Sequence, residues 1–297
     1  MGNSNILKNW ILAVRPKTLP AAAGPVIIGF ALAYREGIHH LSSVFLAALV
    51  ALLIQAGTNM VNDYADFKKG TDDGNRIGPV RVTQAGLISG DNMKRGMLIV
   101  LLLIIIFSIP LVLRGGVPIL IIGILSIISG ILYTAGPFPL GYNGLGDIFV
   151  LIFFGPVATA GTYYVQTLEL SFNSVLAGFG PGLLSVAILS INNLRDYEND
   201  KAVGKRTLIV LFGKRFGKAE YLVTIVVATL IPIIVFLSGE RMNYSIMVCL
   251  LLILSIKPIK IVVKDGSGHV MNDILAITGR ILLAYSLIFA IGWQYPI

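Results

Sequence analysis

The 297-residue chain is 56% hydrophobic and only 13% charged, with a mean hydropathy of +0.84. This composition excludes an ordinary soluble domain, in which about a quarter of the residues are charged. The net charge of +8 raises the alternative of nucleic-acid binding, which depends on where the basic residues lie along the chain.

Long stretches without a charged residue mark candidate membrane spans. A helix needs about 17–25 residues to cross the hydrocarbon layer, and stretches such as Gly37–Asn62 and Leu170–Leu194 have that length. The last segment is interrupted by Arg280, which is either functional or reaches to the headgroups. We expect nine spans, near residues 18–36, 43–62, 96–113, 117–134, 147–166, 174–193, 220–238, 243–261 and 272–293. The predicted fold is therefore all-α, a polytopic membrane helix bundle of about nine transmembrane helices that forms one domain over residues 1–297.

The distribution of basic residues predicts the orientation of this bundle. With a cytoplasmic N-terminus and nine spans, 19 of the 23 Lys and Arg residues fall on the cytoplasmic side. This is the asymmetry of the positive-inside rule. The positive charge thus indicates a multi-pass protein of the cell membrane with its two long loops in the cytoplasm, and no nucleic-acid partner is expected.

These two long polar loops, Asp63–Arg95 and Arg195–Glu220, stand out among otherwise short connections. Together they carry 9 of the 15 acidic residues. Neither loop resembles a separate soluble domain, so we expect the function of the bundle to be concentrated there.

Both loops begin with the same pattern of amides and acids. The second span ends in Asn59-Met60-Val61-Asn62-Asp63-Tyr64-Ala65-Asp66, and the sixth in Asn192-Asn193-Leu194-Arg195-Asp196-Tyr197-Glu198-Asn199-Asp200. If the helices continue past the membrane edge, Asn192, Asp196 and Asp200 form a stripe on one face, and Asn62 lies one turn from Asp66. Like charges at this spacing destabilise a bare helix, so a cation is expected between them.

Magnesium fits such stripes because it prefers oxygen ligands and usually takes one or two carboxylates together with substrate phosphates. Two facing stripes would hold ions around a diphosphate, and basic residues that suit the same ligand are Lys68, Lys69, Arg81, Lys205 and Arg206. Solvated loop ends would be the better interpretation of one Asp-x-x-x-Asp motif; the second, matching stripe favours a site. Transporters place polar residues near the midplane, whereas these lie at one edge, which favours an enzyme.

The residues resemble the two aspartate-rich motifs of the UbiA-type membrane prenyltransferases. The matching segments are Asn62-Asp63-x-x-Asp66 with Gly70 and Asp72, and Asn193-x-Arg195-Asp196-x-x-x-Asp200 with Gly204-Lys205-Arg206-Thr207-Leu208. Three further segments are similar to the branch that prenylates 1,4-dihydroxy-2-naphthoate in menaquinone synthesis: Arg15-Pro16-Lys17-Thr18-Leu19-Pro20, Arg81-Val82-Thr83-Gln84-Ala85-Gly86, and Gly144-Leu145-Gly146-Asp147 followed by Phe153-Phe154-Gly155-Pro156. The resemblance runs from about Trp10 to Trp293.

This resemblance implies roles for individual residues. Metal ligands would be Asn62, Asp66, Asp72, Asn192, Asp196 and Asp200, and the catalytic acids Asp63, Asp66, Asp196 and Asp200, with Asp63 as an indirect or alternate ligand. Diphosphate would bind Arg81, Lys205, Arg206 and Lys68, and the aromatic acceptor Asp147, Arg15 and Lys17.

Two positions depart from the family pattern. Many members have a third aspartate where this chain has Gly70, so Asp72 is expected to serve instead; the alternative is a helix-capping Gly70 followed by a solvated Asp72. Asp147 stands where the branch often has Glu, and its alternative role is to cap a helix.

The implied reaction is Mg²⁺-dependent transfer of a polyprenyl group from an allylic diphosphate to 1,4-dihydroxy-2-naphthoate, with loss of CO₂. The product would be of the demethylmenaquinone type. The alternatives are another aromatic acceptor, such as 4-hydroxybenzoate, and, in a different class, an ion or metabolite transporter.

Overall fold

The computed structural model describes residues 3–70, 78–238, 243–264 and 268–297. Within them the regular structure is helical, with one isolated bridge between Asn243 and Pro296 and no strand. The elements are α1 (Asn3–Val14), η1 (Pro16–Thr18), α2 (Leu19–Arg35), α3 (Leu41–Lys69), α4 (Gly90–Leu132), η2 (Leu140–Tyr142), α5 (Gly146–Ile152), η3 (Phe153–Val157), α6 (Ala158–Thr167), α7 (Phe172–Arg195), α8 (Tyr197–Ala202), α9 (Leu208–Phe212), α10 (Lys214–Leu237), η4 (Tyr244–Leu250), α11 (Leu251–Lys264) and α12 (Val270–Trp293). The all-α fold is confirmed.

The part of the chain that the structure describes has eight helical segments long and apolar enough to cross a membrane. One of them, α4, has 43 residues, about 65 Å at the helical rise and roughly twice the hydrocarbon thickness. Its backbone leaves the helical range at Gly116 (φ 66, ψ −152). Val100 lies beside Gly57 and Gly130 beside Thr58, so both arms of α4 pack against the same turn of α3. The helix therefore folds back on itself at Gly116, and its two arms correspond to the separate spans expected at 96–113 and 117–134.

Several helices continue beyond the expected spans at one end of the bundle. Helix α3 runs to Lys69, where Gly70 (φ 63) ends it with its N–H bonded to the carbonyls of Asp66 and Phe67. Helix α4 begins at Gly90, capped by Ser89, whose hydroxyl accepts from the Asn92 N–H. Hydropathy marks where a helix leaves the apolar layer, whereas the helix itself continues to its capping residue. Gly70 is thus a capping glycine, and Asp72 lies outside the described residues.

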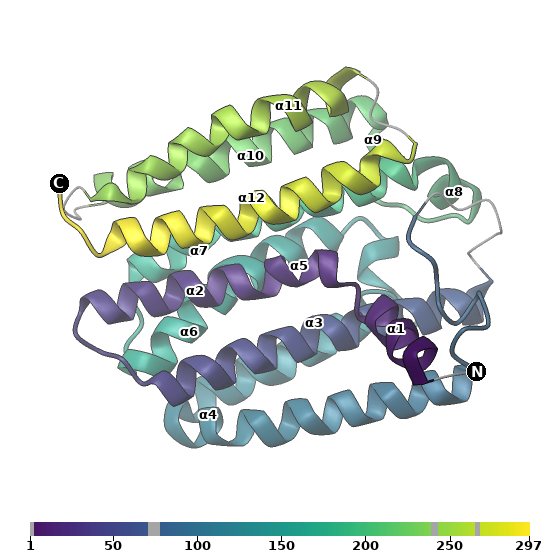
Figure 1. The fold of residues 1–297 in the computed structure, drawn as a ribbon, viewed down its shortest axis with the longest axis horizontal. Coiled ribbons are helices and arrows are strands. Elements are labelled where there is room, and N and C mark those ends of the chain that lie inside the picture. The colour runs from purple at the N-terminus through teal and green to yellow at the C-terminus, as the bar shows by residue number, and fades with distance from the viewer. Residues whose placement is uncertain (1–2, 71–77, 239–242, 265–267) are drawn as a thin grey trace.

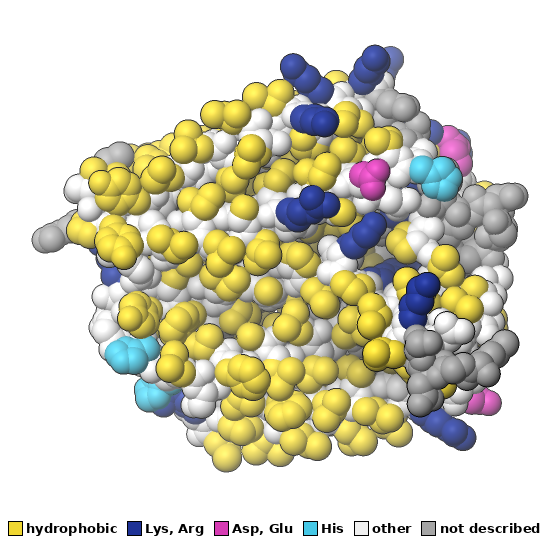
Figure 2. All heavy atoms as spheres, in the orientation of Figure 1, with side chains coloured by type: hydrophobic (Ala, Val, Ile, Leu, Met, Phe, Trp, Pro, Cys, Tyr) yellow, Lys and Arg dark blue, Asp and Glu magenta, His cyan; other side chains and the backbone are white. Residues whose placement is uncertain are grey.

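The long helices run side by side, with α8 and the N-terminus at one end and the C-terminus at the other (Figure 1). Apolar side chains cover the middle of the visible face, and most of the charged side chains visible there lie toward the end that carries α8 (Figure 2). The two motif helices also end there, α3 before the capping Gly70 and α7 at the break before Asp196. This placement brings the two acidic loops together.

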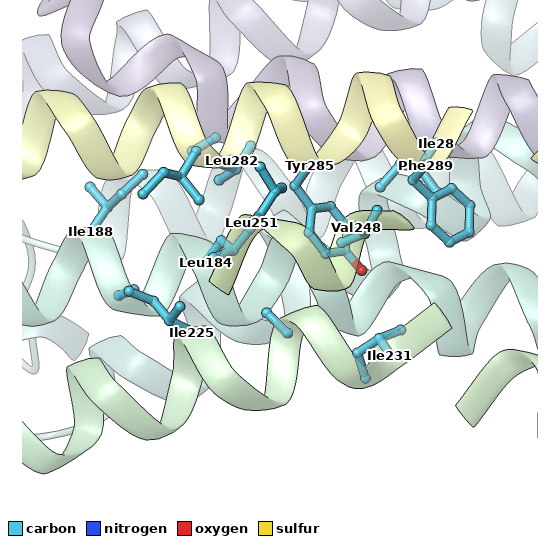
Figure 3. Packing of buried hydrophobic residues seen from close by; sticks show 14 of the residues in the cluster. Ile28, Leu184, Ile188, Ile225, Ile231, Val248, Leu251, Leu282, Tyr285 and Phe289 are labelled. Carbon is cyan, nitrogen blue, oxygen red and sulfur yellow. The ribbon is translucent and has the colours of Figure 1, made fainter. Parts of the chain in front are cut away.

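The main core lies between α2, α7, α10 and α12 (Figure 3). Leu282, Tyr285 and Phe289 of α12 pack toward Leu184 of α7 and Val248 of η4, and all five are fully buried. Lipid is as apolar as these side chains, so close packing rather than exclusion from water stabilises the helix contacts. A rigid half of the bundle results, against which α3 and α4 are arranged.

Glycines allow α7 to approach the interrupted helix of α5, η3 and α6. Gly155 leaves the helical range (φ −123, ψ −110), and the following Pro156 lacks the N–H that would continue the ladder. A Cβ atom at Gly178 would lie 2.7 Å from Pro156 Cα, and one at Gly155 would lie 2.8 Å from the Gly178 carbonyl oxygen. Two backbones are therefore in direct contact at this crossing.

We predict that Gly178→Ala lowers the free energy of unfolding by about 1–3 kcal/mol, because the added methyl group meets backbone that cannot rotate away. The matched control is Gly123→Ala, where an added Cβ has no neighbour within 4 Å. Thermal unfolding of both purified variants in detergent measures the effect. Equal melting temperatures for the two variants would contradict the prediction.

Candidate active site

The first motif lies on the last three turns of α3, and its amides hold neighbouring segments. Asn59 donates to the Val14 carbonyl at 2.8 Å and to Thr18 Oγ1 at 3.0 Å. The Asn62 side-chain oxygen accepts from the Thr134 hydroxyl, beyond the end of α4. Asn59 therefore fixes the η1 segment that carries Arg15 and Lys17.

Asp63 is 1% exposed and accepts backbone hydrogen bonds from the loop that follows α3. Its two oxygens receive the N–H groups of Val82 and Thr83, each at 3.0 Å. Both oxygens of this carboxylate thus face backbone donors, and its observed contribution is to hold the loop that presents Arg81. A direct role for Asp63 in catalysis stays a prediction.

Asp66 joins three elements. Its Oδ2 accepts from Arg81 Nη2 at 2.5 Å and its Oδ1 from the Tyr142 hydroxyl at 2.6 Å. All three side chains come from different elements: α3, the following loop and η2. The structure therefore brings two predicted site residues, Asp66 and Arg81, together, and adds Tyr142.

The second motif departs from the expected single helical stripe. Helix α7 ends at Arg195 and α8 begins at Tyr197, because Asp196 leaves the helical range (φ −93, ψ 7). Arg195 donates two hydrogen bonds to the Asp196 carboxylate, from Nε to Oδ1 at 2.9 Å and from Nη2 to Oδ2 at 2.7 Å. Adjacent residues of a regular helix do not face each other, so this pairing requires the break. The expectation of one continuous helix is wrong here.

Arg195 is a buried residue whose partners the sequence motif did not identify. Besides Asp196 it donates to Asn192 Oδ1 at 2.5 Å and to Asn272 Oδ1 on α12 at 3.0 Å. One guanidinium thus connects two predicted ligands with the last helix of the core. The position of Arg195 inside the motif was the sequence signal for its role. Its partner Asn272 could not be identified in the same way, because it lies 77 residues further along the chain.

Asp200 and Tyr142 connect the two motifs. Lys205 Nζ lies 3.2 Å from Asp200 Oδ1 and 4.8 Å from the centre of the Tyr142 ring. Lys69 Nζ lies 4.1 Å from the same ring and donates to the Thr134 carbonyl at 2.7 Å. Both ammonium groups meet the negative face of one aromatic ring, whose hydroxyl bonds Asp66. Tyr142 therefore stands between the two acidic helix ends.

The other predicted basic residues lie toward the surface. Arg206 and Lys17 are exposed, and the Arg206 N–H donates to the Tyr142 carbonyl at 2.9 Å. Lys68 is exposed and lines a second hollow of about 480 Å³ between α3 and both arms of α4. Arg280 is also exposed, which favours the headgroup interpretation. The contact with Tyr142 is made by Lys69, the neighbour of Lys68.

Glu198 belongs to the exposed surface of the second loop. Lys214 Nζ donates to its Oε1 at 2.6 Å, and this hydrogen bond lowers the pKa of the Glu198 carboxyl below its usual range. The acid nearest in sequence to Asp196 and Asp200 thus faces water, away from the buried pairs.

An apolar cavity of about 420 Å³ lies within the bundle. It is bounded by α2, α3, both arms of α4, α5 and α6, and it is lined among others by Val26, Ile54, Tyr133, Phe149 and Phe153. The Tyr133 phenol lies within reach of the negative charges of Asp147, Asp200 and Asp66. The cavity itself is therefore apolar, and Tyr133 connects its lining with the acids at this end of the bundle.

Oxygen donors of the kind that Mg²⁺ prefers are present in both motifs, but three of the buried carboxylates face a protein cation. The pairs are Asp66 with Arg81, Asp196 with Arg195 and Asp200 with Lys205. No group of three His, Cys, Asp or Glu side chains gathers as a metal site within the described ranges. A magnesium ion that takes one or two carboxylates and completes its shell from phosphates and water does not require such a group, so the donor set fits.

We predict that Asp63→Ala loosens the loop that carries Arg81, because the Val82 and Thr83 amides lose their acceptor. Hydrogen exchange of these two amides should accelerate at least about tenfold, since a lost charge-assisted bond is worth about 1.5–3 kcal/mol. Asp91→Ala is the control, because Asp91 is exposed and pairs only across the surface of α4 with Lys94. Unchanged exchange in Asp63→Ala would contradict this role.

Comparison with known proteins identifies the family. The sequence profile of the UbiA prenyltransferase family matches residues 22–269. The 1,4-dihydroxy-2-naphthoate octaprenyltransferase of Escherichia coli is 37% identical over 290 residues, covering 95% of this chain and 94% of that protein. The protein of the same description from Haemophilus influenzae is 40% identical and covers 75% of each chain.

Solved structures agree with the fold. A UbiA homolog from Archaeoglobus fulgidus bound to GPP and Mg²⁺ superposes with a TM-score of 0.68 at 17% identity, over 95% of this chain and 99% of that one. A homolog from Aeropyrum pernix gives a TM-score of 0.62 over 94% and 97%. At these identities the structures show the shared fold, and the profile match and the curated relatives carry the assignment: the chain belongs to the UbiA prenyltransferase family.

Proposed function

We propose that this protein transfers a polyprenyl group from an allylic diphosphate to 1,4-dihydroxy-2-naphthoate, with loss of CO₂. The observation that carries the proposal is that an apolar cavity lined by Tyr133 lies next to the paired charges around Tyr142, because the Tyr133 ring packs against Gly141. A polyprenyl diphosphate has the same division, with an apolar tail and an anionic head. Relatives described as 1,4-dihydroxy-2-naphthoate octaprenyltransferases support the choice of acceptor.

The diphosphate is proposed to lie between the two motif ends. Arg81 and Lys205 provide fixed positive charge where negative charge develops on the departing diphosphate, which lowers the barrier to ionisation. Arg195 keeps Asn192 and Asp196 oriented. Burial strengthens these interactions, because few waters screen them.

Asn62, Asp66, Asn192, Asp196 and Asp200 would hold magnesium, and Asp72 completes the proposed set from outside the described residues. The ion, when bound, neutralises the diphosphate as its C–O bond breaks. The archaeal homolog bound to GPP and Mg²⁺ supports this proposal.

The cavity is proposed to hold the prenyl tail and to keep water from the allylic cation. Phe149, Phe153 and Tyr133 present aromatic rings along it. Ring faces attract cations, as the two ammonium groups over Tyr142 illustrate. The electron-rich naphthalene carbon then attacks the allylic carbon, and loss of the ring carboxylate as CO₂ restores aromaticity.

The reaction itself is tested by incubating membranes that contain the protein with Mg²⁺, a prenyl diphosphate and a panel of aromatic acids, followed by mass spectrometry. A prenylated naphthoquinol that has lost CO₂ is expected. Prenylation of 4-hydroxybenzoate alone would contradict the acceptor, and no prenylation at all would contradict the function.

We predict that Asp66→Asn and Asp196→Asn each lower turnover at least about 100-fold, because losing one charged ligand costs several kcal/mol of transition-state stabilisation. Both substitutions keep the side-chain shape but weaken the buried pairs with Arg81 and Arg195, so some loss of thermal stability is expected and turnover is compared at a temperature at which both variants are folded. Asp91→Asn, an exposed acid of the same loop, should keep its activity. Wild-type turnover in both variants, or turnover unaffected by a chelator, would contradict the metal site.

The membrane orientation is a further part of the proposal, with the loops Asp63–Arg95 and Arg195–Glu220 in the cytoplasm. In a Cys249→Ser background, Lys201→Cys should react in intact cells only with membrane-permeant thiol reagents. Glu169→Cys, exposed at the opposite end, should react with impermeant reagents as well. Labelling of Lys201→Cys by an impermeant reagent would contradict this orientation.

A further inference from the structure

Asp147 differs from the motif carboxylates because one of its oxygens is buried and unpaired. The residue is 7% exposed, and its Oδ1 has no hydrogen-bond partner among the residues that the structure describes. Leaving a buried carboxylate oxygen unsatisfied costs folding free energy. A helix-capping role does not explain the unpaired oxygen. The backbone N–H of Asp147 itself can bond the other carboxylate oxygen, whereas Oδ1 faces no donor among the described residues.

The location of Asp147 connects the cavity with the charged end. It lies in the first turn of α5, and Val150, one turn further on the same helix face, lines the apolar cavity. The preceding Gly146 lies against the Tyr133 hydroxyl, 3.1 Å from where a Cβ would be. Tyr133 lines the cavity and lies within reach of the charge of Asp147. Asp147 is not itself a lining residue of the cavity, but it adjoins Tyr133 and Val150, which are, so a ring hydroxyl held at this end of the cavity would lie next to Asp147.

The surroundings of Asp147 suit a neutral hydrogen-bond donor rather than an anion. Asp66, Asp196 and Asp200 each face an arginine or a lysine, whereas the described polar groups near Asp147 are a phenol and another acid. That acid is Glu220 of α10, whose carboxylate is held by the Ser190 hydroxyl at 2.7 Å and repels Asp147. Two acids would repel a diphosphate but would attract a phenolic O–H.

We propose that Asp147 Oδ1 accepts the hydrogen bond of a ring hydroxyl of the aromatic acceptor and takes its proton as the new carbon–carbon bond forms. The proposal rests on the function proposed above. The O–H electron pair moves into the ring, the ring carbon attacks the allylic carbon, and the C–O bond to diphosphate breaks. The carboxylate then leaves as CO₂, its electrons return to the ring, and Asp147 returns the proton to the oxygen.

The test compares three acceptors on three proteins. Initial rates are measured for wild type, Asp147→Asn and Asp147→Glu with 1,4-dihydroxy-2-naphthoate and with each analogue in which one hydroxyl is replaced by methoxy. One methoxy analogue should be at least about 100-fold slower on wild type, since it has no proton to give. Asp147→Asn should lose at least about 100-fold with the natural acceptor and less than threefold with that analogue. Asp147→Glu should recover most of the loss.

Two controls separate this role from a structural one. Binding of the prenyl diphosphate, measured by titration without acceptor, should be unchanged in Asp147→Asn. Glu220→Gln removes a neighbouring acid and should leave the preference between the two acceptors as in wild type. An equal loss with both acceptors, or turnover of Asp147→Asn within threefold of wild type, would overturn the proposal. Failure of wild type to prenylate the naphthoate would instead overturn the proposed function.

Discussion

Buried negative charge at one end of an apolar bundle is the constraint on which the loops of this protein depend. Asp66 and Asp196 are each more than nine-tenths buried, and a carboxylate in such a place must be paired or hydrogen-bonded. The chain meets this requirement with cations from other segments, Arg81 for Asp66 and Arg195 for Asp196. Tyr142 then connects Asp66 with the second loop, because its hydroxyl bonds Asp66 and its ring faces Lys205, the partner of Asp200. The described parts of the two long loops are thus arranged around the acids.

These pairs also explain how a site can be stable before substrate arrives. Arg81 and Lys205 neutralise Asp66 and Asp200, and the same two side chains have the charge that a diphosphate requires. Removing either cation would leave a buried carboxylate uncompensated, which costs more than the pair contributes. Folding and substrate binding therefore both require the positive charges of Arg81 and Lys205. The charge balance of the site depends on these cations and on the carboxylates that they face.

The sequence predicted an all-α bundle of membrane-spanning helices, because hydropathy and helical spacing are local properties. It could not distinguish acids that bind backbone from acids that hold cations: Asp63 and Asp66 are three residues apart, yet Asp63 bonds two loop amides and Asp66 bonds Arg81. The break at Asp196 was also missed, because the helical spacing of the motif gives no sign of it. Tyr142 carried no signal of its own, since its partners come from α3 and the second loop.

The two halves of the bundle differ in packing, and this difference suits an amphipathic substrate. Helices α2, α7, α10 and α12 share a large buried core, with glycines where α7 meets Pro156. On the other side, the arms of α4 border the cavity with side chains that are themselves exposed, such as Ile109 and Leu113. In water such a boundary would be costly, but lipid and a prenyl tail are equally apolar. The rigid half can fix the charged end of the site while the other half leaves the tail in contact with the membrane.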